Sequence, residues 1–408
     1  MFKPRDYQAQ IINEGSEKLL ALSILLLAME VRTGKTLTAL GIAQKVGAKK
    51  VVFLTKKKVV LSKTIHNDYD LISPGFEIII TNYEQVHKTD TSDVDLFIID
   101  ESHSFGAFPK PSLRTKNLKK KIGKKKVILL TGTPTPESYS QFYHQFWISD
   151  LSPFKETSFY KWSRSYVNIK KRYLAHGNTV NDYSDANISM IKAKLDKYMI
   201  SYTQKQAGFT SEVKEEVLYV KMKPITYSLV ERLKKDLVIE GETGVILADT
   251  PVKLMQKCHQ LYSGSIKLEE GDRVLIDDSK AVFIKQRFKD NKIAIFYKFI
   301  GELELLKEVF GDDLTTDLEE FNTTDKTIAL QIVSGREGIS LSKADYLIMF
   351  NIDFSATSYW QSRDRMTTKE RAFNKVYWIF SDNGIESEIY KSVKNKKNYT
   401  LSHFKKDF

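Results

Sequence analysis

The sequence has little of what marks a secreted or membrane-spanning protein. It holds one cysteine, Cys258, among 408 residues, so an internal disulfide is impossible and a zinc site built from cysteines is excluded. Such cysteine usage suits a reducing cytoplasm. The most apolar run, Leu19–Ala28, spans about ten residues and is too short to cross a bilayer. Acidic residues precede this run, unlike in a signal peptide. We therefore expect a soluble, cytoplasmic protein.

Charge and composition limit the classes of protein to which the chain can belong. Hydrophobic residues make up 42% of the chain, which favours folded cores over disorder. A length of 408 residues allows two ordinary domains and a smaller insertion. The formal net charge is +12, which suits a polyanion such as nucleic acid. Lysines that merely cover solvated faces would give the same charge, so both interpretations stay open.

Short apolar runs alternate with helical stretches over the first 150 residues. Fully apolar runs of this length are typical of parallel strands that are covered by helices on both faces. The runs that are fully apolar or nearly so are Ile24–Ala28, Val51–Thr55, Glu77–Ile80, Leu96–Ile99 and Val127–Leu130.

The pattern changes after residue 150 and returns later. Residues 151–215 are rich in aromatic and basic residues, and Asn187–Met199 looks helical. Apolar strand runs then resume at Val217–Val220, Ile293–Phe296, Thr327–Val333, Tyr346–Phe350 and Lys375–Phe380. The pattern predicts an α/β fold with domains at 1–150 and 216–408 and a helical insertion or linker at 151–215.

Two runs of lysine, Lys119–Lys121 and Lys124–Lys126, flank Gly123. A solvated surface is the favoured interpretation, and a nucleic-acid contact is the alternative.

A phosphate-binding loop is indicated after the first predicted strand. Arg32-Thr33-Gly34-Lys35-Thr36 lies between a strand and a helical stretch, where backbone N–H groups and a helix N-terminus point at phosphate. Lys35 would reach the β- and γ-phosphates of a nucleotide, and Thr36 would hold Mg²⁺. The general pattern has a glycine where this chain has Met29.

Two more motifs end predicted strands. Asp100 and Glu101 follow Leu96–Ile99, which is where a phosphate-loop enzyme holds the other side of Mg²⁺ and orients the attacking water. Thr131-Gly132-Thr133-Pro134 follows Val127–Leu130. Alone it is a turn sequence, but three motifs in this order are hard to obtain by chance.

The ordered motifs resemble superfamily 2 helicases, and in detail the Snf-type branch of DNA translocases and remodellers. In the first half the resemblance lies in Pro4–Gln8, in Ala28 and Glu30 before the loop, in Ile80–Glu84 and in Asp100–His103. In the second half it lies in Leu195–Met199, Ile295–Phe299, Ser334–Leu341, Gln361–Arg365 and Ile385–Ile389.

The resemblance implies two RecA-like domains in tandem, with ATP and Mg²⁺ as cofactors and ATP between the domains. It implies catalysis by Lys35, Asp100, Glu101 and Arg365, with Mg²⁺ on Thr36 and Asp100. The implied nucleotide contacts are Arg5, Gln8, Arg32, Thr33, Gly34, Lys35, Thr36 and Gln361. The residues implied to contact nucleic acid or couple it to ATP are Thr81, Tyr83, His103, Thr131, Thr133, Ser334 and Gly338.

We therefore expect an ATP-driven motor that moves on DNA, with duplex DNA preferred over RNA, and that unwinds or remodels forks and junctions. The compact chain suggests a phage or mobile-element protein that acts in a bacterial cytoplasm. The alternative is a hydrolysis-impaired clamp that binds nucleic acid. A nuclease subunit is disfavoured because the sequence has no second acidic cluster.

The chain departs from the family pattern at the final motif. A second arginine normally follows the first by three residues, and Thr368 stands there. The motif near residue 334 also carries Arg336 and Glu337 where glycine is usual. Thr368 is too short and uncharged to stabilise a transferring phosphoryl group. Such an arginine is worth on the order of 10³–10⁵ in rate, so its loss calls for a substitute.

We predict that Arg371 assists Arg365. On a helix from Gln361, Arg365 and position 368 share a face, and Arg371 is offset by about 60° with a side chain long enough to swing back. Arg363 points away and is the weaker candidate. Arg365→Ala and Arg371→Ala should each lower DNA-stimulated ATPase at saturating ATP, and Arg363→Ala is measured beside them. A near-normal rate for Arg371→Ala would leave that side chain a surface residue.

Overall fold

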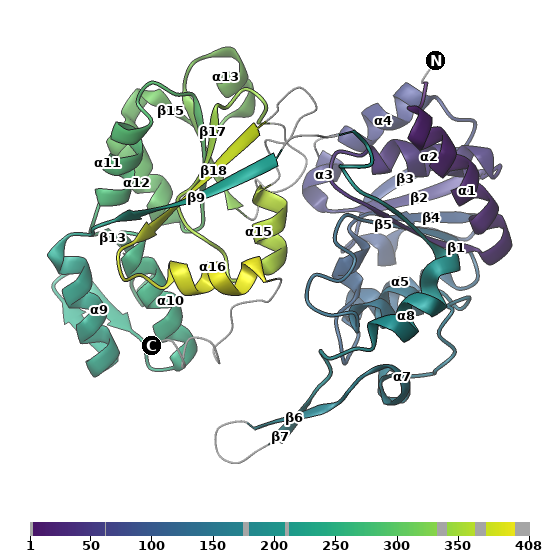
Figure 1. Cartoon of the computed structure of the whole chain (residues 1–408), viewed down its shortest axis with the longest axis horizontal. Helices are drawn as coiled ribbons and strands as arrows, with labels where there is room; N and C mark the ends of the chain where they lie inside the picture. The colour runs from purple at the N-terminus through teal and green to yellow at the C-terminus, as the bar shows by residue number, and fades with distance from the viewer. Residues whose placement is uncertain are drawn as a thin grey trace. The chain divides into compact units, whose positions relative to one another are not determined.

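The computed structural model divides the chain into two compact units, Met1–Phe209 and Thr210–Phe408. The structure describes residues 3–61, 63–173, 179–208, 212–332, 341–363 and 373–395. Each unit is built around its own sheet (Figure 1).

The sheet of unit 1 has six parallel strands among the described residues, in the order β3-β2-β4-β5-β1-β8. The strands are β1 (Ile24–Met29), β2 (Lys50–Thr55), β3 (Glu77–Asn82), β4 (Leu96–Ile99), β5 (Lys126–Thr131) and β8 (Met199–Tyr202). All five apolar runs predicted for this half are strands. Because the strands are parallel, their carboxyl ends meet at one edge of the sheet.

Helices cover both faces of this sheet (Figure 1). They are α1 (Asp6–Leu22), α2 (Lys35–Lys45), α3 (Lys57–Leu61), α4 (Thr64–Ile72), α5 (Leu113–Ile122), α6 (Gln141–Trp147), α7 (Phe159–Tyr166) and α8 (Ile188–Leu195). Short 3₁₀ helices are η1 (Val86–Lys88), η2 (Ser102–Phe105) and η4 (Asp196–Tyr198). Neighbouring residues of β1 enter different cores: Leu26 packs on one face and Leu27 on the other. Burial on both faces explains why these strands are apolar at every position.

The stretch 151–215, expected to be a helical insertion or linker, contains strands as well as helices. Residues up to 209 belong to unit 1, and β9 already begins at residue 212 in unit 2. The stretch also holds an antiparallel hairpin, β6 (Lys170–Tyr173) and β7 (Thr179–Asp182), which projects from the body of unit 1 (Figure 1). Strand β8 pairs with β1 at the sheet edge. It was missed because a four-residue edge strand with one fully buried residue has no apolar run.

The sheet of unit 2 also has six parallel strands among the described residues, in the order β15-β16-β14-β17-β18-β9. The strands are β9 (Glu212–Val220), β14 (Ile293–Tyr297), β15 (Leu314–Thr315), β16 (Thr327–Gln331), β17 (Tyr346–Met349) and β18 (Phe373–Ser381). The helices are α9 (Pro224–Asp236), α10 (Pro251–Tyr262), α11 (Ser279–Arg287), α12 (Ile300–Phe310), α13 (Leu318–Thr323), α15 (Ala356–Arg363) and α16 (Glu386–Lys394). Two small hairpins pair β10 (Val238–Gly241) with β11 (Gly244–Leu247) and β12 (Ser265–Lys267) with β13 (Arg273–Leu275), and η5 is Gly311–Asp313.

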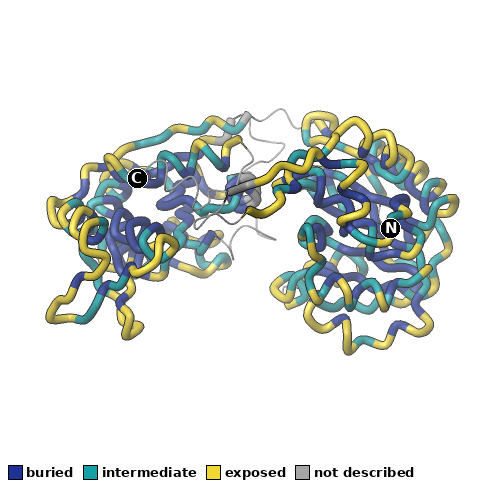
Figure 2. Tube along the Cα trace, turned by 90° about the horizontal axis from the view of Figure 1, so that it is seen from below, coloured by how far each residue is buried: buried dark blue, intermediate teal, exposed yellow. Residues whose placement is uncertain are grey.

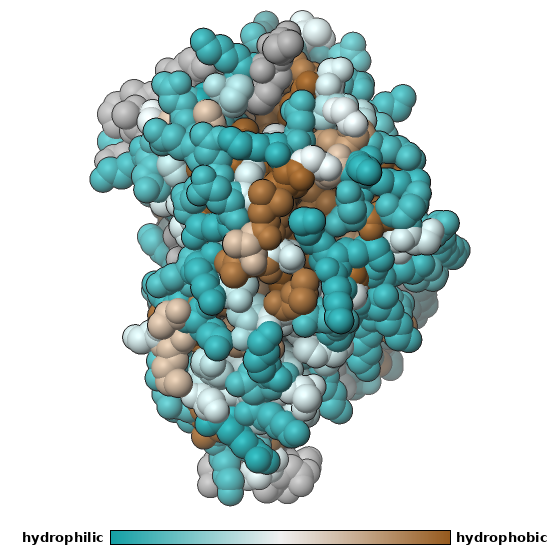
Figure 3. Space-filling view, turned by 90° about the vertical axis from the view of Figure 1, so that its right-hand side faces the viewer, coloured by the Kyte–Doolittle hydropathy of each residue, from teal (hydrophilic) through white to brown (hydrophobic). Residues whose placement is uncertain are grey.

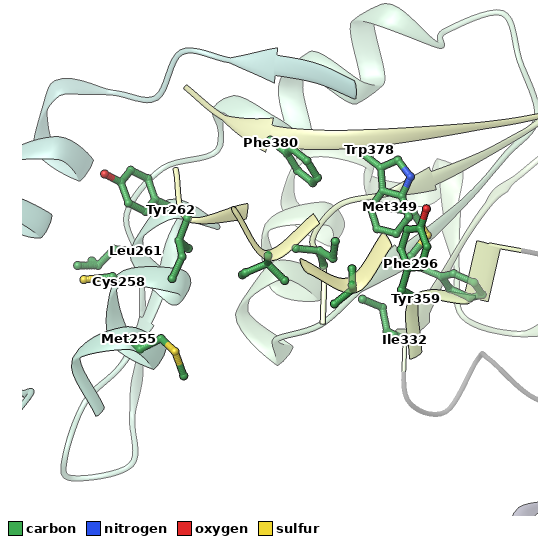
Figure 4. Close-up of a cluster of buried hydrophobic side chains, with 14 of the residues drawn as sticks. Met255, Cys258, Leu261, Tyr262, Phe296, Ile332, Met349, Tyr359, Trp378 and Phe380 are labelled. Carbon is green, nitrogen blue, oxygen red and sulfur yellow. The ribbon is translucent and has the colours of Figure 1, made fainter. Parts of the chain in front are cut away.

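Large aromatic side chains fill the core of unit 2 beside the sheet. Trp378 of β18 and Tyr359 of α15 stack with ring centroids 5.2 Å apart (Figure 4). Cys258 lies in the same core and is fully buried, where burial raises the pKa of its thiol to about 12. Burial of Trp162 and Trp378 supports the interpretation of these tryptophans as core residues.

In both units the buried residues lie in the interior and the exposed residues lie toward the outside (Figure 2). Polar side chains cover most of the face in Figure 3, apart from a central strip of apolar residues. Within the described ranges, no helix has both the length and the apolar character to span a bilayer. The predicted fold class, two RecA-like parallel-sheet domains in tandem, is confirmed.

Candidate nucleotide-binding site

The predicted phosphate loop joins the end of β1 to the start of α2. Arg32 and Gly34 have left-handed backbones, with φ of 63° and 78°, and α2 begins at Lys35. Thr33 is fully buried, and its hydroxyl donates to the Glu30 carbonyl over 2.7 Å. The chain therefore turns sharply and presents the N-terminus of an 11-residue helix, the geometry that suits an anion.

Glycine is required at position 34 for two reasons. Its positive φ disfavours any side chain, and a Cβ there would meet Gln8 Nε2 at 2.4 Å. Gln8 is held in place because its Oε1 accepts from the Arg5 backbone N–H over 3.0 Å. Its amide also faces the Gly34 carbonyl at 3.4 Å. The structure thus brings Gln8, one of the implied nucleotide contacts, against the phosphate loop.

The loop is also held by a segment that sequence reasoning missed. The Gln204 backbone N–H donates to Glu30 Oε2 over 2.7 Å, and its side-chain amide donates to the Val31 carbonyl over 3.0 Å. Tyr7 donates its hydroxyl to the Thr33 carbonyl and stacks on Tyr202, with ring centroids 4.8 Å apart. The Gln204 contacts join residues about 170 positions apart in the sequence, and no local pattern connects them.

Met29 occupies the place of the usual first glycine without disturbing the loop. It is the last residue of β1, is fully buried, and pairs with Tyr202 of β8. The strand therefore runs one residue further than expected, and the turn is made by Arg32 and Gly34 instead.

The carboxylate pair follows β4 as predicted. Asp100 Oδ2 accepts from the Thr55 hydroxyl over 2.9 Å, and its backbone carbonyl accepts from the Tyr83 hydroxyl over 2.6 Å. Its N–H donates to the Leu54 carbonyl of β2 over 2.8 Å. Neighbouring strands therefore fix both the main chain and the carboxylate of Asp100.

The environment shifts the pKa values of the two carboxyl groups in opposite directions. Burial and the adjacent Glu101 raise the pKa of Asp100, although Lys35 and Thr55 act against them. Burial also acts to raise the pKa of Glu101, but His103 and Lys35 outweigh it and the pKa falls. Glu101 is therefore the group that stays charged most readily, and Asp100 carries the unfavourable charge.

His103 connects the acidic pair to the turn after β5. Its Nδ1 lies 3.3 Å from Glu101 Oε2 and 3.1 Å from the Thr131 hydroxyl. That hydroxyl also accepts from the Thr133 backbone N–H over 3.1 Å. A Cβ on Gly132 would lie 3.5 Å from Lys35 Nζ. The three predicted motifs therefore converge at one sheet edge.

Thr81 and Tyr83, which were predicted to contact nucleic acid or couple it to ATP, lie beside this edge. Thr81 is in β3, is half-buried and pairs with Leu54. Tyr83 is only 3% exposed, and its ring packs edge-on against Phe105. Tyr83 therefore supports Asp100 from within the core, and Thr36 is half-buried at the second residue of α2.

Several predicted residues of unit 2 lie outside the described residues, namely Ser334, Gly338, Arg365, Thr368 and Arg371. Gln361 lies in α15. Arg363 is described, and its Nε lies 2.8 Å from Glu215 Oε1. Glu215 also accepts from Tyr359, Tyr390 and Trp378. Arg363 is thus bound into the core of unit 2, consistent with its place as the weaker arginine candidate.

The residues of unit 1 fit a magnesium-bound triphosphate. Glu101 Oε2 is buried, and His103 Nδ1 lies 3.3 Å from it. Asp100 and Thr36 offer the oxygen ligands that Mg²⁺ prefers, and Mg²⁺ takes few protein ligands alongside phosphate oxygens. A nearby cation would offset the buried negative charge, and Lys35 would meet the phosphates at the helix N-terminus.

Comparison with known proteins places the chain in a family. A model of the SNF2-related domain matches residues 24–280, more than half of the chain. The chain therefore belongs to the SNF2-related domain family, a group of Snf-type superfamily 2 ATPases. A search of the curated proteins found no match.

Two solved structures are similar over most of their length. One is the Sulfolobus solfataricus SWI2/SNF2 ATPase core in complex with dsDNA, with 17% identity and a TM-score of 0.43, covering 97% of this chain and 91% of that chain. The other is the Sulfolobus solfataricus SWI2/SNF2 ATPase core domain, with 16% identity and a TM-score of 0.42, covering 97% and 89%.

The raised pKa of Asp100 predicts that its charge destabilises the nucleotide-free fold. A carboxyl whose pKa is raised from 3.8 to about 6 on folding binds its proton more tightly in the folded state. The free-energy cost of burying the Asp100 charge is therefore absent when the pH is below the unfolded-state pKa, and it is complete when the pH is above the folded-state pKa. Asp100→Asn should raise the free energy of unfolding by about 1–2 kcal/mol at pH 8, and the gain should vanish near pH 4. Thermal unfolding without nucleotide measures it.

Asp95→Asn is the matched control, because Asp95 precedes the same strand and its carboxylate accepts from the Lys49 and Lys50 N–H groups. It should not stabilise unit 1 at pH 8. An equal gain in both variants would mean that general charge repulsion, rather than burial of Asp100, sets the effect.

Proposed function

We propose that the chain is an ATP-driven motor that hydrolyses ATP in unit 1 and moves along nucleic acid, with duplex DNA preferred. The observation that carries this proposal is the convergence of Lys35, Asp100 and Glu101 beside a helix N-terminus. Membership of the SNF2-related domain family supports the same function.

Each residue has a role that follows from its place. Lys35 neutralises the β- and γ-phosphates, and the backbone N–H groups from Arg32 to Thr36 cradle them. Thr36 and Asp100 hold Mg²⁺, which spreads the charge that develops on the phosphate oxygens when bound. Glu101 keeps its charge and orients the attacking water.

The surroundings of Glu101 suggest how hydrolysis is coupled to movement. His103 faces both Glu101 and Thr131, and one Nδ1 cannot donate fully to both. A shift of the Thr131–Thr133 turn would therefore change how firmly Glu101 is held. Arg5 and Gln8 are proposed to contact the base, and Thr81 the track.

The remaining roles rest on the motif resemblance in unit 2. Arg365 is proposed to stabilise the transferring phosphoryl group, and Gln361 to contact the nucleotide. Ser334 and Gly338 are proposed to link the ATP state to the nucleic acid. The +12 charge favours a phosphate backbone as the track.

Substitution of the two central residues should separate binding from turnover. Lys35→Ala should lower DNA-stimulated ATPase by at least about 10²-fold, because it removes an electrostatic partner of the phosphates. Glu101→Gln should still bind ATP but turn it over about 10²–10⁴-fold more slowly. Steady-state ATPase and binding of a fluorescent ATP analogue measure both.

Lys45→Ala, at the far end of α2, is the matched control and should behave as wild type. Unchanged turnover in Lys35→Ala or Glu101→Gln would show that the active site lies elsewhere. Wild-type protein that binds DNA and ATP without turnover would favour the hydrolysis-impaired clamp.

Binding to the track should depend steeply on salt and little on sequence. If six or more phosphates are contacted, affinity should fall by about 10³-fold or more between 50 and 200 mM salt. With ATP, the protein should displace a third strand from a duplex without opening the duplex. Failure there, together with efficient unwinding of forked DNA, would mean that the chain is a strand-separating helicase.

A further inference from the structure

A lysine-rich pocket lies at the amino-terminal edge of the sheet in unit 1. Its volume is about 490 Å³, and it is formed by the end of α5, the turn at Gly123 and the starts of neighbouring strands. Ser23 precedes β1, Asp95 precedes β4, and Lys126 opens β5. The pocket therefore lies at the opposite edge from Lys35 and Asp100. Six-residue strands put the two edges roughly 20 Å apart.

The lysines around this pocket fall into two groups. Some have an internal role: Lys119 Nζ lies 2.8 Å from Asp150 and 2.9 Å from the Trp147 carbonyl. Lys121 donates to the Thr89 carbonyl over 2.9 Å, and Lys125 donates to the Lys121 carbonyl over 3.5 Å. Lysines near a helix C-terminus commonly serve this purpose. They are explained by the fold alone.

Lys120, Lys124 and Lys126 are different. Among the described residues, none of their ammonium groups has an ion-pair or hydrogen-bond partner. Lys120 and Lys124 are exposed, and Lys126 is half-buried. Three like charges held near one another raise the electrostatic free energy of the free protein, and a polyanion would lower it.

The acidic residue in the pocket does not neutralise them. Asp95 already accepts from the Lys49 N–H over 2.9 Å and from the Lys50 N–H over 3.3 Å. Its carboxylate is therefore turned to the backbone at the start of β2. The pocket keeps an excess of positive charge.

The turn that carries these lysines is fixed. Gly123 has φ of 55°, which favours glycine, and its carbonyl accepts from the Asp150 N–H over 2.9 Å. The Lys125 N–H donates to the Ile122 carbonyl over 3.0 Å, and the Lys126 N–H to the Asp95 carbonyl over 3.2 Å. The lysine stems thus start from a rigid frame, which lowers the cost of ordering them on a ligand.

We propose that this pocket binds the phosphate backbone of a second nucleic-acid segment, separate from the track. The pocket offers ammonium groups and no exposed large apolar side chain, because Ile122 is the one large apolar residue of its lining and is fully buried. Protein partners need apolar or aromatic anchors, and small-molecule sites are mostly apolar. Spaced ammonium groups on an open surface suit successive phosphates. The choice of nucleic acid rests on the proposed function.

The test uses the full chain with Lys120→Ala, Lys124→Ala and Lys126→Ala combined. The matched control combines Lys192→Ala, Lys194→Ala and Lys205→Ala, which removes the same charge from other exposed positions of unit 1. Titration with a short duplex should give two duplexes per wild-type or control chain and one per pocket variant. For the weaker binding step of the wild type, the logarithm of the binding constant should fall with the logarithm of the salt concentration with a slope of about −2.7, because three phosphates are neutralised.

ATP turnover at saturating duplex distinguishes this proposal from the proposed function. The pocket variant should keep wild-type turnover, since the track is elsewhere. Loss of turnover in the pocket variant would make the pocket part of the track and overturn the proposal, as would stoichiometry and salt slopes equal to those of the control. Wild-type protein that binds two duplexes but hydrolyses no ATP would refute the motor and leave the pocket standing.

Inorganic phosphate alone is the remaining probe. A site that engages phosphates along a backbone should show no saturable phosphate binding by calorimetry. Saturable phosphate binding that is lost in the pocket variant would identify a free-phosphate site and overturn the nucleic-acid assignment.

Discussion

Two adjacent carboxylates, Asp100 and Glu101, are held at a partly buried strand end where each makes the charge of the other less favourable. The surroundings offset this repulsion with groups from several elements. Thr55 donates from β2, His103 approaches from η2, and Lys35 contributes its charge from α2. These contacts require the strands to be parallel, because only then do the carboxyl ends of β2, β4 and β5 meet beside α2.

The pattern of apolar residues made most strands of both sheets predictable. Leu26 and Leu27 pack on opposite faces, so an unbroken apolar run is what a doubly covered strand demands. The same dependence on burial explains why β8 and the β6–β7 hairpin were not predicted. An edge strand or a projecting hairpin buries little, so its sequence carries no strong period.

The candidate site was predictable to the extent that its residues are local in sequence. Lys35, Asp100 and Thr131 each end or follow an apolar run, and topology alone brings them together. Support from far along the chain could not be foreseen, because Gln204 is an ordinary polar residue without a motif. The ion pair of Arg363 could not be predicted either, since its partner Glu215 lies on a strand about 150 residues earlier.

The contacts of Gln204 and Tyr202 also have a mechanical meaning. These residues hold the phosphate loop through the Glu30 and Val31 main chain and side chain, and they lie only a few residues before the end of unit 1 at residue 209. The last described residues of unit 1 are therefore bound to the loop that follows β1. Because of these contacts, the loop and the segment that ends unit 1 cannot move independently of each other.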